Sequence, residues 1–188
     1  MKRFMEHLLV AAIVLALLVI GLGAAVYSGL YDIGADDHHW PLTYAFLQSV
    51  RDRSIHVRSA RLEVPDLKDP QLVSKGAGQY VAMCNGCHLA PGVEDAEIRA
   101  GMYPQPPNLS KARVDPRDAF WVIKHGVKMS GMPAWGGSHD DRTIWSMVAF
   151  LQKLPDLTPQ QYRDIVAKAP PDHDAKMSGG HDPMPDEH

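Results

Sequence analysis

The sequence predicts a chain of short α-helices joined by long loops and preceded by one membrane-spanning helix. Residues 8–31 contain no charged side chain. Several later segments place apolar residues three and four positions apart, which is the spacing of one helix face. Glycine and proline, 15 of each, gather in the middle and the tail, where they interrupt regular structure.

The apolar run at residues 8–31 is long enough to cross a bilayer, which needs about 20 residues. A cleaved signal peptide has a shorter apolar core of about 7–15 residues, and residues 21–25 are a poor cleavage site. We therefore expect residues 1–31 to be a retained anchor. Lys2 and Arg3 precede the run and aspartates follow it, so the N-terminus should be cytoplasmic and the remainder periplasmic, at a bacterial inner membrane. The net charge of −3 shows no footprint of nucleic-acid binding.

Residues 32–68 form a membrane-proximal linker with a short helix. Pro41 can occupy a first helical position, and Leu42, Phe46 and Val50 continue at helical spacing to about Ile55. The linker also carries four arginines, namely Arg51, Arg53, Arg58 and Arg61. Two interpretations stay open: a spacer whose arginines lie near lipid headgroups or upstream acidic residues, or a docking segment for a partner membrane protein.

The only two cysteines, Cys84 and Cys87, stand two residues apart and are followed at once by His88. A C-x-x-C-H motif is typical of c-type haem attachment, because both sulfurs lie on one helical face and the histidine can reach the iron. A thioredoxin-like site would need a βαβ setting, and a structural zinc site needs four ligands. Spacing alone does not exclude a disulfide, but a disulfide gives His88 no role.

The predicted haem domain spans residues 69–157. Asp69 and Pro70 begin a helix that leads into Cys84. Gly76 costs roughly 1 kcal/mol inside a helix, so we expect another helix to cross closely there. Residues 89–110 are rich in proline and are predicted to be a loop.

That loop could offer a backbone carbonyl to the free ring nitrogen of His88, and Pro91 and Pro107 are the candidates. Asp115 and Pro116 begin a further helix, which should end at His125 and Gly126.

The next loop, residues 127–137, holds two methionines. We predict Met132 as the sixth iron ligand, because Gly131 and Pro133 constrain the backbone on both sides of it. Met129 and His125 are the alternatives. A thioether ligand raises the reduction potential relative to two nitrogen ligands.

Two more helices are predicted near the C-terminus. An S-x-x-D capping signature at Ser138 starts a helix over about residues 139–153, and Thr158 caps a short helix within residues 158–169. Residues 170–188 lack apolar periodicity and should be a disordered tail rich in His, Met and Asp. Such a tract could also bind a metal.

Residues 69–157 resemble the monohaem class I cytochrome c family, in its membrane-anchored bacterial form. Cys84, Cys87 and His88 look like the attachment motif, and Gly131 with Met132 and Pro133 looks like the distal-ligand motif. Gly76, Tyr80 and Phe150 stand where this family places a glycine and two aromatic residues.

The resemblance implies an all-α class I cytochrome c fold in which the first and last helices cross near Gly76. It also implies one covalently bound haem c, held by Cys84 and Cys87 with His88 and Met132 as axial ligands.

We therefore expect an electron-transfer protein rather than an enzyme, acting as a tethered shuttle or as a subunit of an oxidoreductase complex. The expected donor is a quinol-oxidising complex or a periplasmic dehydrogenase, and the expected acceptor is a terminal oxidase or reductase. Two alternatives are a ligand-binding or peroxidatic haem protein, and a metal-handling protein that uses the tail.

Overall fold

The computed structural model describes residues 2–170 of the 188-residue chain. Within these residues it is built of helices and irregular segments, with no strand. The chain divides into two compact units, Met1–His39 and Trp40–His188. Apart from Pro170, the predicted tail lies outside the described residues. The all-α prediction is confirmed.

The first unit contains one long helix, α1 (Lys2–Tyr27), which has no buried residue. Within residues 2–170, α1 is the helix that is long and apolar enough to cross a membrane.

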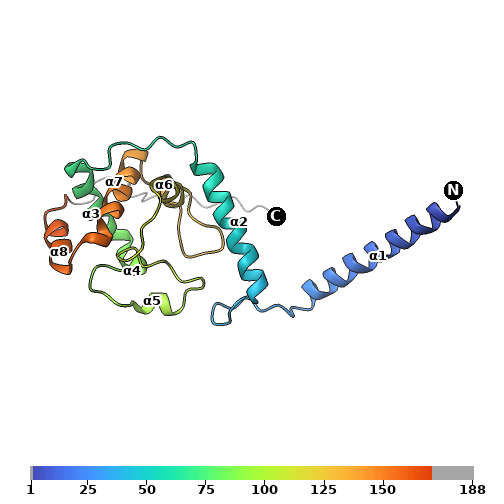
Figure 1. Ribbon diagram of the computed structural model, residues 1–188. Helices are drawn as coiled ribbons and strands as arrows, with labels where there is room; N and C mark the ends of the chain where they lie inside the picture. The colour runs from blue at the N-terminus through green and yellow to red at the C-terminus, as the bar shows by residue number, and fades with distance from the viewer. Residues whose placement is uncertain (1, 171–188) are drawn as a thin grey trace, which may run out of the picture. The chain divides into compact units, whose positions relative to one another are not determined.

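The second unit contains the remaining helices, which are short and joined by irregular segments (Figure 1). In chain order they are α2 (Pro41–Ser59), α3 (Pro70–Met83), α4 (Asn85–His88), α5 (Glu97–Ala100), α6 (Pro116–His125), α7 (Asp141–Lys153) and α8 (Pro159–Ala167), with 3-10 turns η1 (Trp135–Gly137) and η2 (Leu154–Asp156).

Three helix starts occur where capping residues predict them. The Asp69 carboxylate accepts the Gln71 N–H at the start of α3. The Asp115 carboxylate accepts two N–H groups at the start of α6. Thr158 forms a capping box at the start of α8. Each cap is followed by a proline, whose fixed φ suits the first helical position.

The predicted start of the penultimate helix is wrong by two residues. Helix α7 begins at Asp141, and its cap is Asp140, whose carboxylate accepts the Thr143 N–H. Ser138 does not cap it. The Ser138 hydroxyl instead lies 3.3 Å from the Trp135 carbonyl, because turn η1 occupies that stretch of chain.

Two other predicted boundaries also change. Helix α2 continues to Ser59 rather than about Ile55. The predicted loop at residues 89–110 contains a single helical turn, α5. The prolines of this loop lie before and after the turn and not within it.

The core of the second unit is built on the crossing of α3 and α7 at Gly76 (Figure 1). A Cβ atom at Gly76 would lie 1.9 Å from the backbone oxygen of Ser146, so only glycine permits this approach. One turn further on, the rings of Tyr80 and Phe150 pack with centroids 5.4 Å apart. The crossing predicted at Gly76 is confirmed.

Helices α6 and α2 extend this core. The Phe120 ring on α6 stacks on Trp145 of α7 at 4.2 Å. Helix α2 packs on α6, and the Arg117 side chain of α6 donates to the Leu62 carbonyl just after α2, at 2.9 Å. The Tyr44 ring of α2 lies 5.7 Å from that of Tyr103, in the loop after α5.

Candidate haem site

The two cysteines and His88 lie on one helical turn. Cys84 ends α3, and α4 begins at the next residue. The Cys84 carbonyl accepts the N–H groups of Cys87 at 3.1 Å and of His88 at 2.8 Å. Both thiols are free, so they do not form the disulfide that spacing allows. This turn presents two thiols and an imidazole together.

The His88 ring is held by the carbonyl of Pro107, which lies 2.9 Å from Nδ1. Of the two predicted carbonyls, Pro107 is therefore the partner. Burial lowers the pKa of His88, the Pro107 hydrogen bond raises it, and the nearby Arg99 lowers it further, with a net downward shift. A neutral imidazole that donates through Nδ1 keeps the lone pair of Nε2 available for a metal.

The backbone of His88 is fixed as well. Its carbonyl accepts the Leu109 N–H at 3.0 Å and lies 3.2 Å from the Tyr80 hydroxyl. The same hydroxyl lies 2.6 Å from the carbonyl of Leu89, a buried residue with a φ of 64°. Burial raises the pKa of Tyr80, so its phenol stays protonated and serves as a donor. Helix α3 and the proline-rich loop of residues 89–110 (the proline loop) thus immobilise the histidine from two sides.

Cys84 is a thiol with a strongly shifted pKa. Burial, with a smaller contribution from Cys87, raises its pKa to about 12. The side chain packs against the hydrophobic core of the unit. Cys84 therefore stays a neutral thiol in the free chain.

The loop of residues 127–137, which holds both candidate methionines (the methionine loop), folds back on the end of α6. The Val127 N–H donates to the Met132 carbonyl at 3.1 Å, and the Ser130 hydroxyl lies 3.2 Å from the Met132 N–H. Gly126 closes the loop with a φ of 65°, and a Cβ there would lie 2.8 Å from the Met132 carbonyl. These contacts fix the backbone at Met132.

The three candidates for the sixth ligand differ in burial. Met132 is half-buried and packs against the core. Met129 is fully exposed, at 101%, and has a φ of 56°. His125 is exposed beside Trp121. Burial therefore favours Met132, in agreement with the choice made from its flanking residues.

Two residues of the proline loop were missed from the sequence. A Cβ at Gly131 would lie 2.7 Å from the Met102 methyl carbon, so the segment after α5 meets the methionine loop. Arg99 on α5 is buried, and its Nε lies 3.3 Å from the Asp95 carboxylate. The only signal for Arg99 was its position four residues after Asp95, a spacing typical of helical ion pairs.

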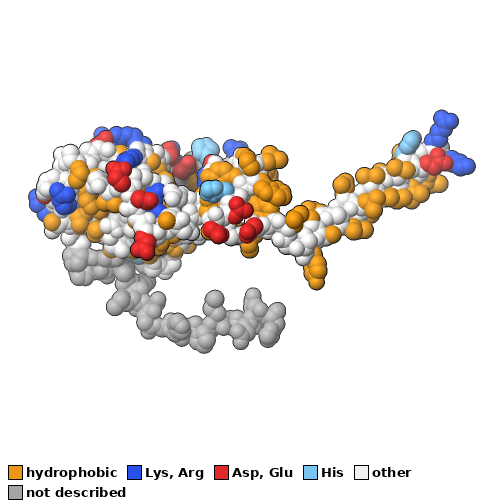
Figure 2. All heavy atoms as spheres, turned by 90° about the horizontal axis from the view of Figure 1, so that it is seen from below, with side chains coloured by type: hydrophobic (Ala, Val, Ile, Leu, Met, Phe, Trp, Pro, Cys, Tyr) orange, Lys and Arg blue, Asp and Glu red, His pale blue; other side chains and the backbone are white. Residues whose placement is uncertain are grey.

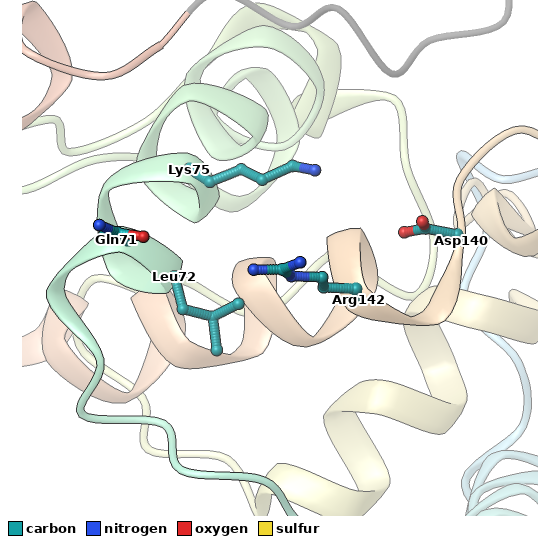
Figure 3. A pocket seen from close by; sticks show the side chains of 5 residues that line it. All are labelled: Gln71, Leu72, Lys75, Asp140 and Arg142. Atoms are coloured by element: carbon teal, nitrogen blue, oxygen red, sulfur yellow. The ribbon is translucent and has the colours of Figure 1, made fainter.

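A surface pocket of about 330 Å³ lies apart from these residues, at the first turns of α3 and α7 (Figure 3). Its lining consists of Gln71, Leu72, Lys75, Asp140 and Arg142. None of the four predicted haem residues belongs to it. The Asp140 carboxylate in this pocket already serves as the cap of α7.

The donor set fits a covalently held haem. The turn supplies two free thiols for the vinyl groups of the haem and a neutral imidazole with one free nitrogen. The methionine loop supplies a half-buried thioether. A core of α-helices in which α3 and α7 cross at a glycine, together with this turn, defines a c-type cytochrome domain.

Comparison with protein families agrees with this class. Residues 71–151 match the family model described as cytochrome c oxidase, cbb3-type, subunit III. The match places residues 71–151 in the c-type cytochrome family, which consists of haem-binding electron-transfer domains. It leaves out α1, α2 and α8. The comparisons with curated proteins and with solved structures found no match.

Proposed function

We propose that this protein is a membrane-anchored, monohaem c-type cytochrome that carries single electrons between respiratory redox partners. Cys84 and Cys87 would hold one haem c, with His88 and Met132 as the axial ligands of its iron. The observation that carries this proposal is the His88 ring, whose Nδ1 is held by Pro107 at 2.9 Å so that Nε2 is free.

When bound, the haem supplies a one-electron ferric–ferrous couple. The chain's own residues do the rest. Pro107 and Leu109 orient His88 through its ring and its backbone. Gly126 and Ser130 hold the methionine loop. A soft thioether ligand favours the ferrous state and raises the potential.

Replacing Met132 by alanine tests the ligand assignment. We expect a large fall in reduction potential and binding of carbon monoxide by the ferrous protein, because the sixth position opens. The matched control is Met129→Ala in the same loop, which should change neither property because Met129 is fully exposed. An unchanged spectrum and potential in the Met132 variant would refute the assignment. Carbon monoxide binding by the wild type would instead favour a ligand-binding or peroxidatic haem protein.

Helix α1 supports the anchor, because from Leu8 onward it is apolar on every side and none of its residues is buried in protein. We expect the protein to stay in the membrane pellet after alkaline carbonate extraction, and the haem domain to be digested by protease added to spheroplasts. Release into the supernatant would contradict a retained anchor. Protection of the haem domain in intact spheroplasts would contradict the periplasmic orientation.

The family description favours an oxidase as the acceptor or as the host complex. The donor would be a quinol-oxidising complex or a periplasmic dehydrogenase. Extraction in a mild detergent followed by identification of co-purifying subunits tests this. Recovery of oxidase subunits in fixed proportion supports a subunit role, whereas a haem protein that purifies alone and reduces an added oxidase supports a tethered shuttle.

A further inference from the structure

We propose that the guanidinium of Arg99 binds a propionate carboxylate of the haem. The inference rests on the proposed function, because it requires a haem on the Cys84–His88 turn. Arg99 lies on α5 and is only 7% exposed. A cation so deeply buried requires a buried acceptor, since an unpaired one is costly.

The acceptors that surround Arg99 do not satisfy it. Its Nη2 lies 3.4 Å from the side-chain oxygen of Gln105, which is long for such a bond. Its Nε lies 3.3 Å from Asp95, whose side chain is 65% exposed, and makes no well-aligned hydrogen bond there. Nη1 is buried and has no hydrogen-bond partner. The guanidinium therefore has unused donors in a site closed to water.

The position of Arg99 indicates which acceptor is missing. Gln105, which contacts both the side chain and the carbonyl of Arg99, lies two residues before Pro107, whose carbonyl holds the His88 ring. The chain after it contacts both sides of the site, through Met102 against Gly131 and through Pro107 against His88. Haem is the anionic group expected here, and its propionates are carboxylates. Arginine binds a carboxylate through two parallel N–H donors.

A buried positive charge near the iron also affects the redox couple. Reduction removes one positive charge from the iron, so the guanidinium favours the ferrous form. Its removal should lower the equilibrium constant for reduction by up to about tenfold, which is 59 mV for a one-electron couple.

The test compares Arg99→Gln, Arg99→Lys and the control Arg163→Gln in the full haem-loaded chain. Arg163 is exposed on α8 and contacts Gln160 of the same helix. Its replacement by glutamine changes the net charge of the protein by the same amount as Arg99→Gln does. Two properties are measured: the reduction potential, and the redox-induced infrared band of haem whose propionates carry ¹³C. We expect Arg99→Gln to lower the potential and shift the carboxylate band, Arg99→Lys to restore much of the potential, and the control to change neither.

An unchanged potential and band in Arg99→Gln would overturn the inference, and so would equal shifts in Arg163→Gln. If Arg99→Gln does not fold, an Arg99→Lys protein with the wild-type carboxylate band overturns it, because lysine lacks the two-pronged geometry. The proposed function fails separately, through a wild-type intact mass that shows no covalent haem after co-expression with the haem-attachment machinery.

A different observation concerns the outward face of α2. Its inner side packs on α6 through the buried Ser59, whose hydroxyl bonds the Asp118 carboxylate. Its outer side presents an apolar stripe formed by Leu42, Phe46, Val50 and Val57, with exposures of 83, 65, 51 and 52%. The spacing of these residues places them on one face. Figure 2 shows hydrophobic side chains gathered in this part of the molecule.

We infer that this apolar stripe lies in the headgroup region of an anionic bilayer. The inference rests on the proposed anchor. Residues 28–40 join α1 to α2 and can span at most about 45 Å, so the start of α2 stays within that reach of the membrane that α1 crosses. Arg53 falls within the stripe, and Arg58 and Arg61 follow it. Apolar side chains beside arginines are the composition of interfacial helices, and each arginine gains from anionic lipids.

The test places the photo-crosslinker p-benzoylphenylalanine at Phe46, or at Val81 of α3 as an exposed apolar control. The full chain is reconstituted in vesicles of phosphatidylethanolamine and phosphatidylglycerol, and in vesicles of phosphatidylcholine alone. We expect a lipid adduct at position 46, fewer adducts without the anionic lipid, and none at position 81.

No lipid adduct at position 46, or equal adducts at both positions, would overturn the inference. A protein adduct in place of lipid in native membranes would overturn it in favour of a docking partner. Carbonate extraction tests the anchor independently.

Discussion

Replacing Gly76 by alanine tests the helix crossing on which the domain is built. A Cβ at this position would lie 1.9 Å from the Ser146 oxygen and 3.0 Å from the Phe150 Cβ. Close carbon–oxygen contacts in proteins begin at about 3.3 Å, so relieving the clash would require α3 and α7 to separate by roughly 1.4 Å at this point. The obstacle is backbone, and no side-chain rotation relieves it.

Two opposing terms set the magnitude. Alanine is about 1 kcal/mol better than glycine inside a helix. Overpacking costs about 1–3 kcal/mol, and more where the backbone must move. Separation would also loosen the packing of Tyr80 on Phe150, which are 1% and 0% exposed. We expect a net loss of about 2 kcal/mol, which lowers the melting temperature by roughly 10 °C for a domain of this size.

The assay is thermal unfolding of the haem-loaded protein in detergent, followed by circular dichroism. The control is Gly101→Ala, because a Cβ at Gly101 meets nothing within 4 Å. Its free energy of unfolding should change by no more than about 0.5 kcal/mol. If both the Gly76→Ala protein and the control melt at the wild-type temperature, the close approach of α3 and α7 at Gly76 is refuted.

Two further predictions concern hydrogen bonds that shape the fold. Asp140→Ala should cost about 1 kcal/mol at neutral pH, because α7 loses the acceptor of the Thr143 N–H. That bond lowers the pKa of Asp140 below its ordinary value of 3.8. The stabilisation is therefore present above pH 3.8 and is lost as the pH falls through the lower pKa of the folded protein. The free energies of unfolding of the two proteins, measured by denaturant titration, should converge in acid, and a constant difference would contradict the cap. Tyr80→Phe should cost about 1 kcal/mol, because the Leu89 carbonyl loses a buried donor. An unchanged denaturation midpoint would show that this hydroxyl is not needed.

Helix starts were predictable where one local signal acts alone. A cap bonds an N–H two or three residues away, so Asp69, Asp115 and Thr158 can be recognised without the rest of the chain. Two signals compete before α7, where Ser138 and Asp140 both have the right chemistry. The turn η1 decides between them, because it engages the Ser138 hydroxyl.

The sequence by itself determined the attachment turn, because Cys84, Cys87 and His88 are neighbours and one helical turn brings them together. It also determined the apolar run of α1, and the cost of Gly76 inside a helix predicted that another helix crosses there. Only the tertiary structure decided which carbonyl holds His88, since Pro107 is 19 residues away and reaches it through an irregular loop. Only the structure showed that Met132 is half-buried, that Met129 is exposed and that Arg99 is buried, because burial depends on contacts between segments distant in the chain.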